Sequence, residues 1–299
     1  MRPAVSTAAP ARRPSPAVVL ELLKPITWFP PMWAFGCGLV ASGAGLEGWP
    51  LMLLGILLAG PLVCGMSQAV NDWFDRHVDA INEPHRPIPS GRIAGTWGLR
   101  IALAGTLLSL LVAWATGPWV LAATMLGLAC AWAYSAPPLR FKASGWLGPA
   151  VVALSYEGLS WFTGAAVMAG ALPRGEVLVV LLLYSFGAHG IMTLNDFKAV
   201  AGDRATGLRS LPVTLGVARA ARLACLVMAG AQVVVIAVLA SWGLLWSAAI
   251  VAVLLLGQLA AMPRLLRDPA RFAPWYNGTG VTMYVLGMLA AALGLGGHI

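Results

Sequence analysis

Charged residues are scarce in this chain. Asp, Glu, Lys and Arg make up 10% of its 299 residues, and only 11 residues are acidic, whereas a soluble domain carries about a quarter charged residues. Hydrophobic residues make up 59% of the chain, and its mean hydropathy is +0.81. This composition excludes an ordinary soluble domain and indicates an integral membrane protein.

Cysteine is also rare, and so is any grouping of residues that binds soft metals. The four cysteines stand singly within apolar segments, and the chain has four His and no C-x-x-C pair. This pattern argues against a disulfide framework or a zinc site and predicts packing roles for the cysteines. The alternation of apolar and polar residues that is typical of a membrane barrel is also missing, so we expect helices.

Apolar segments of bilayer-spanning length recur along the chain, since about 20 residues of helix cross the hydrocarbon core. We predict an all-α polytopic membrane protein with nine transmembrane helices around a central cavity, and two Asp-rich motifs at its cytoplasmic face. The predicted spans are residues 28–46, 50–70, 96–116, 118–136, 147–171, 176–194, 220–241, 243–262 and 279–297. Residues 1–19, rich in Pro, Ala and Arg, predict a disordered cytoplasmic tail ahead of a membrane domain over 20–299.

The positions of the basic residues predict the orientation. With nine spans and a cytoplasmic N-terminus, 18 of the 19 Lys and Arg fall in cytoplasmic segments, and only Arg174 falls outside. This is the bias that retains positive charge inside the cell, and it places the C-terminus in the periplasm. The net charge of +8 therefore belongs to one membrane face, and we expect a lipid bilayer and no nucleic acid as partner.

The few acidic residues are concentrated in two places, and the first of these follows an apolar span. Asn71, Asp72, Asp75 and Asp79 form the pattern N-D-x-x-D-x-x-x-D. Positions 72, 75 and 79 lie on one face of a helix, because side chains three and four residues apart are neighbours. A solvated loop would explain one such cluster alone, since charges beside a span are ordinary.

A second copy of the pattern follows the sixth predicted span. Asn195, Asp196 and Asp203 repeat the Asn, the first Asp and the last Asp of the first copy, with the two Asp again seven positions apart. Both copies follow spans of the same direction, so they reach the same face, and we expect Asp196 and Asp203 on one helix face. Two matching clusters favour a site between the halves of the chain over two solvated loops.

The chemistry of the two motifs points to a divalent cation. Facing carboxylates repel each other unless cations lie between them, and a set of oxygen ligands selects a hard ion such as Mg²⁺, which binds carboxylates together with substrate phosphates. Basic and polar residues accumulate beside the motifs, as binding of a diphosphate requires. The candidates for binding the diphosphate are Lys24, Arg76, Arg86, Tyr134, Ser135, Arg140, Lys142, Asn195, Lys198 and Arg204.

These motifs, together with Y-S-x-P-P-x-R-x-K at 134–142, resemble the UbiA superfamily of intramembrane prenyltransferases, and the resemblance extends over 20–297. The runs 23–38, 71–93 and 195–216 are similar to its chlorophyll and bacteriochlorophyll synthase branch, and to the bacterial members in particular. The chain departs from that pattern at Ala201, where related synthases carry Glu.

The resemblance implies an activity, transfer of a C20 prenyl group (geranylgeranyl or phytyl) from its diphosphate to the 17-propionate carboxylate of a chlorophyllide or bacteriochlorophyllide. It implies Mg²⁺ as cofactor, with Mn²⁺ as a possible substitute. The implied metal ligands are Asn71, Asp72, Asp75, Asp79, Asp196 and Asp203, and the five Asp are the implied catalytic residues. It also implies a bacterial inner, intracytoplasmic membrane, and assembly proteins of the photosynthetic apparatus as partners.

The acceptor site is less evident in the sequence. Candidates are Trp28, Trp73, Glu157, Trp161 and His189. Tryptophan also anchors helices at membrane interfaces, and a carboxylate within a span is costly enough to suggest function, although a protonated Glu bonded to a neighbouring helix explains it equally well. For the histidine we favour a hydrogen bond between helices over ligation of the magnesium of the macrocycle.

Two alternatives stay open at this level. The first keeps the chemistry and changes the acceptor to a quinone precursor or haem. The second is a cation or proton transporter, which would place its acids near the middle of the bilayer rather than at a membrane edge beside Arg and Lys.

Overall fold

A computed structural model of the chain describes residues 13–299, which form helices joined by short loops and no named strand. The first half of the chain contains α1 (Pro16–Leu22), α2 (Phe29–Ala41), α3 (Trp49–Leu57), α4 (Gly65–Asn82), α5 (Trp97–Thr116), α6 (Pro118–Ser135), α7 (Leu147–Ala153) and α8 (Ser160–Ala169). The second half contains α9 (Gly175–Asn195), α10 (Val200–Thr206), α11 (Leu211–Leu215), α12 (Val217–Ser241), α13 (Leu245–Arg267), α14 (Pro269–Gly278) and α15 (Gly280–Leu295).

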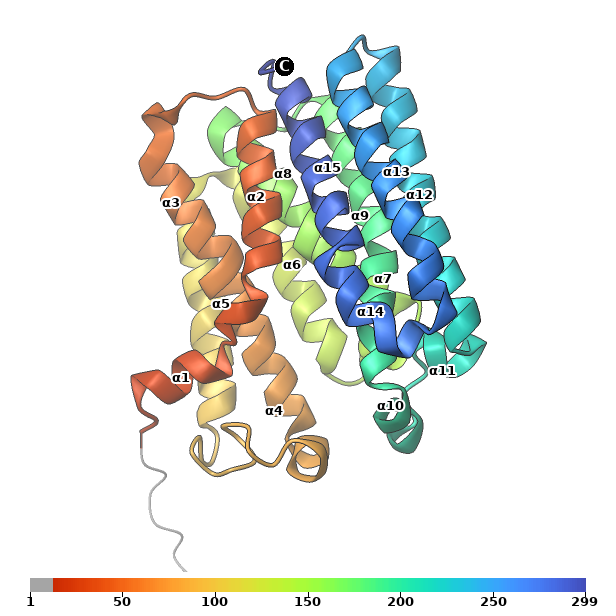
Figure 1. The fold of residues 1–299 in the computed structure, drawn as a ribbon. Helices are drawn as coiled ribbons and strands as arrows, with labels where there is room; N and C mark the ends of the chain where they lie inside the picture. The colour runs from red at the N-terminus through yellow and green to blue at the C-terminus, as the bar shows by residue number, and fades with distance from the viewer. Residues whose placement is uncertain (1–12) are drawn as a thin grey trace, which may run out of the picture.

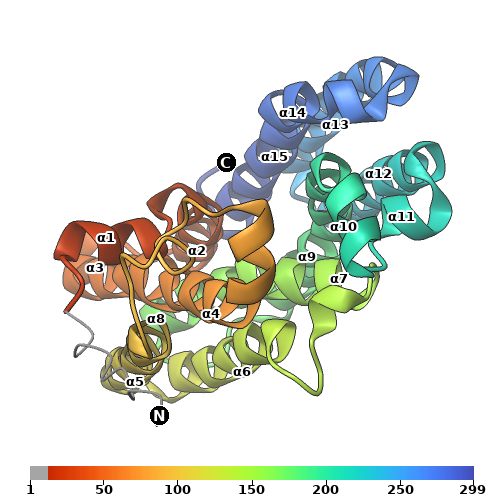
Figure 2. The ribbon, with the colours of Figure 1, turned by 90° about the horizontal axis from the view of Figure 1, so that it is seen from below.

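The long helices stand side by side in a bundle, with α1 at one end and the C-terminus at the other (Figure 1). The helices of the first half pack against those of the second half, chiefly through contacts of α2 with α15 and of α7 with α9. Seen from below, the end of α4 and the short helix α10 approach the viewer at the same end of the bundle (Figure 2). Both Asp motifs therefore reach one end of the molecule, as the sequence predicts.

Two helices of the bundle contain a π-helical segment. Leu58–Cys64 joins α3 to α4 in one continuous helix, and Leu154–Leu159 joins α7 to α8 in another. The first of these helices runs from Trp49 to Asn82 over 34 residues. At that length it is ~50 Å long, whereas the hydrocarbon core is ~30 Å thick. Its last turns, which carry the first Asp motif, therefore project beyond the apolar layer.

The prediction of an all-α membrane protein is confirmed. Among residues 13–299, seven helical stretches are long and apolar enough to cross a membrane. Helices occupy all nine predicted ranges, but α2 has only 13 residues, and the α7–α8 helix is not one of the seven. The count of nine therefore stays a prediction.

Two sequence expectations need correction. Pro16–Leu22 forms helix α1, so the predicted disordered tail over 1–19 extends too far. The helix is stabilised by its apolar face, where Leu22 is fully buried. Residues 1–12 of the predicted tail lie outside the described residues. The second Asp motif is not on one helix. The chain leaves α9 at Asn195, passes through a 3₁₀ turn at Asp196–Lys198 and begins α10 at Val200.

Glycines allow a very close contact between α2 and α8. A Cβ atom on Gly38 of α2 would lie 2.1 Å from the carbonyl oxygen of Trp161 in α8, and one on Gly164 would lie 2.1 Å from the carbonyl oxygen of Phe35. Backbones that approach this closely are typical of membrane helices. Lipid gives no hydrophobic driving force between helices, so they associate through close packing, which small residues permit. This contact fixes α8, and hence the π-helical segment before it, against α2.

Candidate functional site

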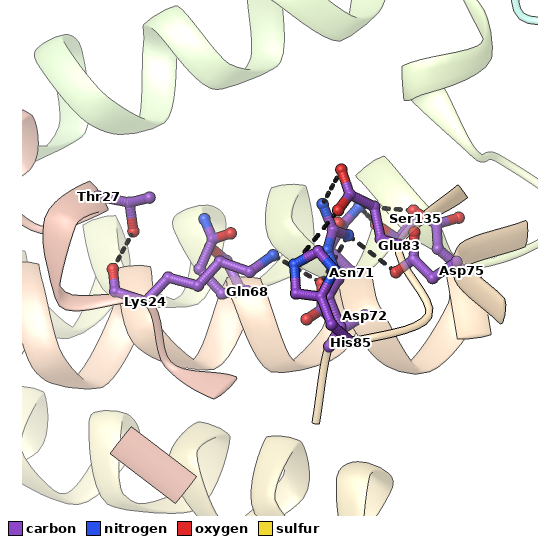
Figure 3. A network of polar contacts seen from close by, with 12 residues as sticks. Lys24, Thr27, Gln68, Asn71, Asp72, Asp75, Glu83, His85 and Ser135 are labelled. Carbon is purple, nitrogen blue, oxygen red and sulfur yellow. Dashed lines mark hydrogen bonds and ion pairs between the residues drawn. The ribbon is translucent and has the colours of Figure 1, made fainter. Parts of the chain in front are cut away.

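The first Asp of the first motif is completely buried. Asp72 accepts a hydrogen bond of 2.7 Å from the Lys24 ammonium and lies 3.5 Å from the Arg86 guanidinium. Figure 3 shows Lys24 extending toward Asp72 from the segment before α2. A buried carboxylate is costly unless it is paired, and these two cations provide that pairing for Asp72. The contact also fixes the segment before α2 to the middle of α4.

The last Asp of the motif shares one of these cations. Arg86 Nη1 lies 2.8 Å from Asp79 Oδ2, and Asp79 is also buried. Burial lowers the pKa of the Arg86 guanidinium, but the carboxylates of Asp72 and Asp79 outweigh this effect and raise it. The loop after α4 therefore returns a permanently charged group to the motif from which it starts.

Asp75, the middle Asp, points in a different direction. It is bonded to the Lys142 ammonium, and its carboxylate lies 4.0 Å from Arg140. Burial lowers the pKa of the Lys142 ammonium, and the neighbouring Asp75 offsets only part of this effect. Asn71 donates both amide hydrogens, to Asp75 at 3.1 Å and to Ser135 at 3.2 Å. Its carbonyl oxygen remains as an acceptor.

The two motifs meet at a polar cavity of about 320 Å³. The first motif contributes Asn71 and Asp75, and the second contributes Asn195, Asp196 and Asp203. The remaining lining residues are Tyr134, Lys142, Ser144, Gly145, Gly148, Pro149, Val152, Met192, Leu208 and Ser210. The expected juxtaposition of carboxylates is present, and the break after α9 is what brings Asp203 to the same cavity as Asp196.

Backbone contacts join the loops of the two halves beside this cavity. The Gly145 amide donates to the Arg209 carbonyl at 2.9 Å, and the Arg209 amide donates to the Ala143 carbonyl at 3.2 Å. A Cβ atom on Gly145 would lie 2.5 Å from the Leu211 nitrogen, so the contact requires glycine. The loop that carries Lys142 is thereby held against the segment that follows Asp203.

Two of the predicted diphosphate ligands have an unusual backbone. Lys24 and Arg140, with φ of 47° and 38°, are the only non-glycine residues with positive φ among residues 13–299. This conformation is uncommon for residues with a Cβ atom, and such outliers cluster at functional sites. Each of these two residues has a left-handed backbone conformation and places its own basic side chain beside the first Asp motif.

A second, mostly apolar cavity of about 240 Å³ adjoins the polar one. It lies between the α3–α4 helix, α6 and the α7–α8 helix, and both π-helical segments contribute to its wall. The two cavities share Asn71, Tyr134 and Val152. The site therefore has a polar end with carboxylates and a Lys, and an apolar end that extends toward the membrane interior.

Several predicted residues do not line either cavity. Asp72 and Asp79 lie beside the polar cavity in their ion pairs, and Lys198 and Arg204 are exposed. Arg76 stacks over Trp73 at 4.3 Å.

None of the five acceptor candidates lines either cavity. Trp161 is fully buried and stacks on Tyr184, and Glu157 is buried in the π-helical segment. His189 Nε2 lies 3.2 Å from the Trp146 carbonyl oxygen, which is the hydrogen bond between helices that we favour from the sequence. Trp28 donates to the Leu23 carbonyl at 2.8 Å.

The structure adds residues that the sequence analysis missed. The side-chain amide of Asn277 in α14 donates to the side-chain oxygen Oδ1 of Asn195 at 3.1 Å. This bond directs the side-chain amide hydrogens of Asn195 away from α14. Gln68 and Tyr156 line the apolar cavity. Gln68 stands one helical turn before Asn71 and is a polar residue within an apolar span, which is the signal that could have indicated it.

The donor set suits a hard cation that is shared with a ligand. Within residues 13–299, no group of three or more His, Cys, Asp or Glu side chains lies close enough together to hold a metal ion. A cation in the polar cavity would therefore take carboxylate oxygens from both motifs and further oxygens from a bound molecule, which is how Mg²⁺ binds at phosphate sites.

Comparison with known proteins is consistent with this geometry. Residues 29–277 match the UbiA prenyltransferase family. The chain is 62% identical to the bacteriochlorophyll synthase 33 kDa chain of Cereibacter sphaeroides over 96% of both chains, and 57% identical to that of Rhodobacter capsulatus over 97% of both. The structure of a UbiA homolog from Archaeoglobus fulgidus bound to GPP and Mg²⁺ has a TM-score of 0.64 and 20% identity, and covers 93% of this chain and 96% of that one.

Proposed function

The chain belongs to the UbiA prenyltransferase family, and on that premise we propose that it is a bacteriochlorophyll synthase. It transfers a C20 prenyl group from its diphosphate to the propionate carboxylate of bacteriochlorophyllide. The observation that carries the proposal is the junction of the two cavities at Asn71, Tyr134 and Val152. A polar end for a diphosphate meets an apolar end for a hydrocarbon chain, and the relatives named above support the choice of acceptor.

The diphosphate occupies the polar cavity. Lys142, which lines the cavity, and Arg140, which lies beside Asp75, stabilise the negative charge that develops on the departing oxygen, and their effect is large because the site is partly closed to water. The predicted role of Lys24, which is paired with Asp72, remains a proposal. The Asn195 amide hydrogens, directed by Asn277, donate to a phosphate oxygen. Tyr134 lies at the junction and contacts the end of the substrate where the bond breaks.

The oxygen ligands of the polar cavity fit Mg²⁺. Asp75 of the first motif and Asp196 or Asp203 of the second, with the free side-chain carbonyl oxygen of Asn71, would hold an ion together with oxygens of the diphosphate, because no three carboxylates of the described residues lie close enough to share one ion. The predicted roles of Asp72 and Asp79 as ligands remain proposals. When bound, Mg²⁺ supplies positive charge that neutralises the diphosphate. The chain's own contribution is to place these carboxylates on α4 and on the segment after α9, beside the two loops that are held together at Gly145 and Arg209.

The reaction needs no general base. One carboxylate oxygen of the acceptor forms a bond to C1 of the prenyl group, and the bond from C1 to the diphosphate oxygen breaks with its electron pair. The acceptor is already ionised at neutral pH, so no proton is transferred. The apolar cavity excludes the water that would otherwise trap the allylic cation.

A two-substrate assay tests the proposal. Membranes that contain the protein are incubated with geranylgeranyl or phytyl diphosphate and with either bacteriochlorophyllide, chlorophyllide or an aromatic carboxylic acid, and the products are identified by mass spectrometry. We expect esterified bacteriochlorophyllide, loss of product when Mg²⁺ is chelated, and recovery on addition of Mg²⁺ or Mn²⁺. Product from the aromatic acid alone would contradict the acceptor assignment and favour the quinone-precursor alternative.

A further inference from the structure

Four polar side chains stand together in the wall of the mostly apolar cavity. They are Cys64, Ser67, Gln68 and Tyr156, here named the polar ledge. The Gln68 amide donates to the Tyr156 hydroxyl oxygen at 3.2 Å, and the Cys64 thiol lies 3.3 Å from the same oxygen. Ser67 donates to the Cys64 carbonyl at 2.7 Å. The ledge thus joins the two helices that face each other across the cavity.

The backbone under the ledge is specialised. Cys64 ends one π-helical segment and Tyr156 lies in the middle of the other, and these are the two π-helical segments found between residues 13 and 299. A π-turn inserts an extra residue into a helix and is often located at a functional site. Here both insertions supply residues to one cavity and to one hydrogen-bonded cluster, which packing alone does not require.

The ledge lies close to the reacting end of the proposed substrate. Gln68 precedes Asn71 by three residues on α4, so it lies ~4.5 Å farther along the helix axis, away from the polar cavity. With the diphosphate in the polar cavity, C1 of the prenyl group lies near the shared residues Asn71 and Tyr134. A nucleophile must approach C1 from the side away from the departing oxygen, and the ledge is on that side.

The ledge offers hydrogen-bond donors without positive charge. The Tyr156 oxygen accepts from Gln68, and a thiol sulfur is only a weak acceptor, so the Tyr156 hydroxyl hydrogen is available to a bound molecule. The Gln68 amide also contacts the Cys64 thiol, which is a weak acceptor that a carboxylate oxygen replaces readily. Hydrogen bonds to a carboxylate are about twice as strong as those between neutral groups. Neutral donors can therefore hold a carboxylate without pairing it with a cation that would reduce its reactivity.

We propose that Gln68 and Tyr156 form the subsite for the carboxylate of the acceptor, and that they orient one of its oxygens toward C1. The inference rests on the proposed prenyl transfer to a carboxylic acid. A cavity of about 240 Å³ is smaller than the ~300–1,000 Å³ of sites for drug-sized ligands. It therefore admits the carbons of the prenyl group next to C1 together with the propionate arm of the acceptor, and the macrocycle stays outside it.

Two variants and a modified acceptor test the subsite. Tyr156→Phe and Gln68→Leu should each lower kcat/KM for bacteriochlorophyllide by ~10–100-fold, and should leave the KM for the prenyl diphosphate within about twofold. The free acid should inhibit binding of a labelled acceptor at least tenfold better than its propionate methyl ester does in the wild type. That preference should disappear in Tyr156→Phe.

The outcomes separate this inference from the proposed function. Tyr184→Phe is the matched control, because its hydroxyl is buried without a hydrogen-bond partner and lies outside both cavities. A wild type that does not esterify bacteriochlorophyllide contradicts the proposed function. An active wild type whose variants keep their preference for the free acid, or lose affinity for the diphosphate instead, overturns the subsite.

Discussion

Three Asp residues on one helix face have different partners, and this difference is the main result at the scale of single residues. Asp72 and Asp79 are buried against Lys24 and Arg86, whereas Asp75 faces the polar cavity beside Lys142. The first two carboxylates hold the N-terminal segment and the loop after α4 in place, and the third is available to a metal ion.

Substitutions at Asp72 and Asp75 should therefore have different effects. Asp72→Asn leaves Lys24 without its charged partner and removes one of the carboxylates near Arg86, which keeps Asp79. We expect a loss of about 1–3 kcal/mol of stability, less than for a fully buried pair because both cations are partly exposed. Asp75→Asn should instead raise the Mg²⁺ concentration for half-maximal activity by at least ~10-fold. Thermal unfolding in detergent and a Mg²⁺ titration of activity measure the two effects, and an exchange of the two phenotypes would contradict the assignment.

The charge state of Lys142 should set the alkaline limit of activity. Burial lowers the pKa of this ammonium from its usual 10.5, so the side chain loses its proton, and its ability to stabilise the departing diphosphate, as the pH rises through that lowered value. We expect kcat/KM for the diphosphate to decline below pH 10.5. Lys142→Arg should move the decline to higher pH, since a guanidinium stays charged, and Lys142→Met should lower kcat/KM ~10²-fold at neutral pH. An alkaline limb that is the same in the Arg variant would show that another group titrates.

Asn277 should act through Asn195. The side-chain amide of Asn277 donates to Oδ1 of Asn195, and Asn277→Leu removes this bond while keeping a side chain of similar volume. We expect the KM for the diphosphate to rise ~5–10-fold, since one hydrogen bond contributes about 1 kcal/mol, with the acceptor KM unchanged. Steady-state kinetics with each substrate varied in turn measure this effect, and a change confined to the acceptor KM would contradict it.

At the scale of helices, the sequence predicts the first motif better than the second. A spacing of three and four residues places Asp72, Asp75 and Asp79 on one face, and α4 is indeed continuous to Asn82. The same reasoning fails after Asn195, where the helix breaks although no Gly or Pro occurs between positions 195 and 201. The polar ledge is equally hidden, because its position depends on two π-helical segments that leave no pattern in the spacing of apolar residues.

Packing of α2 on α8 should be sensitive to one methyl group. Gly38→Ala would place a carbon atom 2.1 Å from the Trp161 carbonyl oxygen, so the helices must separate, and we expect a loss of about 1–3 kcal/mol. Gly36 is the matched control on the same helix, because a Cβ atom there meets nothing within 4 Å. Gly36→Ala should be neutral or slightly stabilising. Thermal melts of both variants in detergent distinguish them, and equal melting temperatures would show that the close contact is relaxed in the protein.

At the scale of the whole molecule, the two ends of the bundle differ in charge. The Asp motifs lie at one end (Figure 2), and the sequence predicts that 18 of the 19 Lys and Arg lie at the same end, on the cytoplasmic side. The sequence predicts this charge difference because Lys and Arg are concentrated in alternate segments between the spans, which indicates the direction of each span. The meeting of the two halves is less predictable, since it depends on contacts such as Gly145 with Arg209, between residues far apart in the chain.

Labelling of single cysteines should establish the orientation. Ala205 in α10 and Ala171 in the turn after α8 are both exposed and flank opposite ends of α9, while the native cysteines are buried or half-buried. In intact spheroplasts, a membrane-impermeant maleimide should modify Ala171→Cys readily, and Ala205→Cys only after permeabilisation. The reverse pattern would place the Asp motifs in the periplasm and overturn the orientation.

The two cavities share three lining residues, Asn71, Tyr134 and Val152, and this narrow overlap has a consequence for how substrate preference evolves. Most substitutions in the apolar wall leave the carboxylates and basic residues untouched, so a lineage can exchange one lipid or acceptor for another while it keeps the means of releasing diphosphate. The same separation gives protein engineers a boundary at which chambers from different relatives can be recombined.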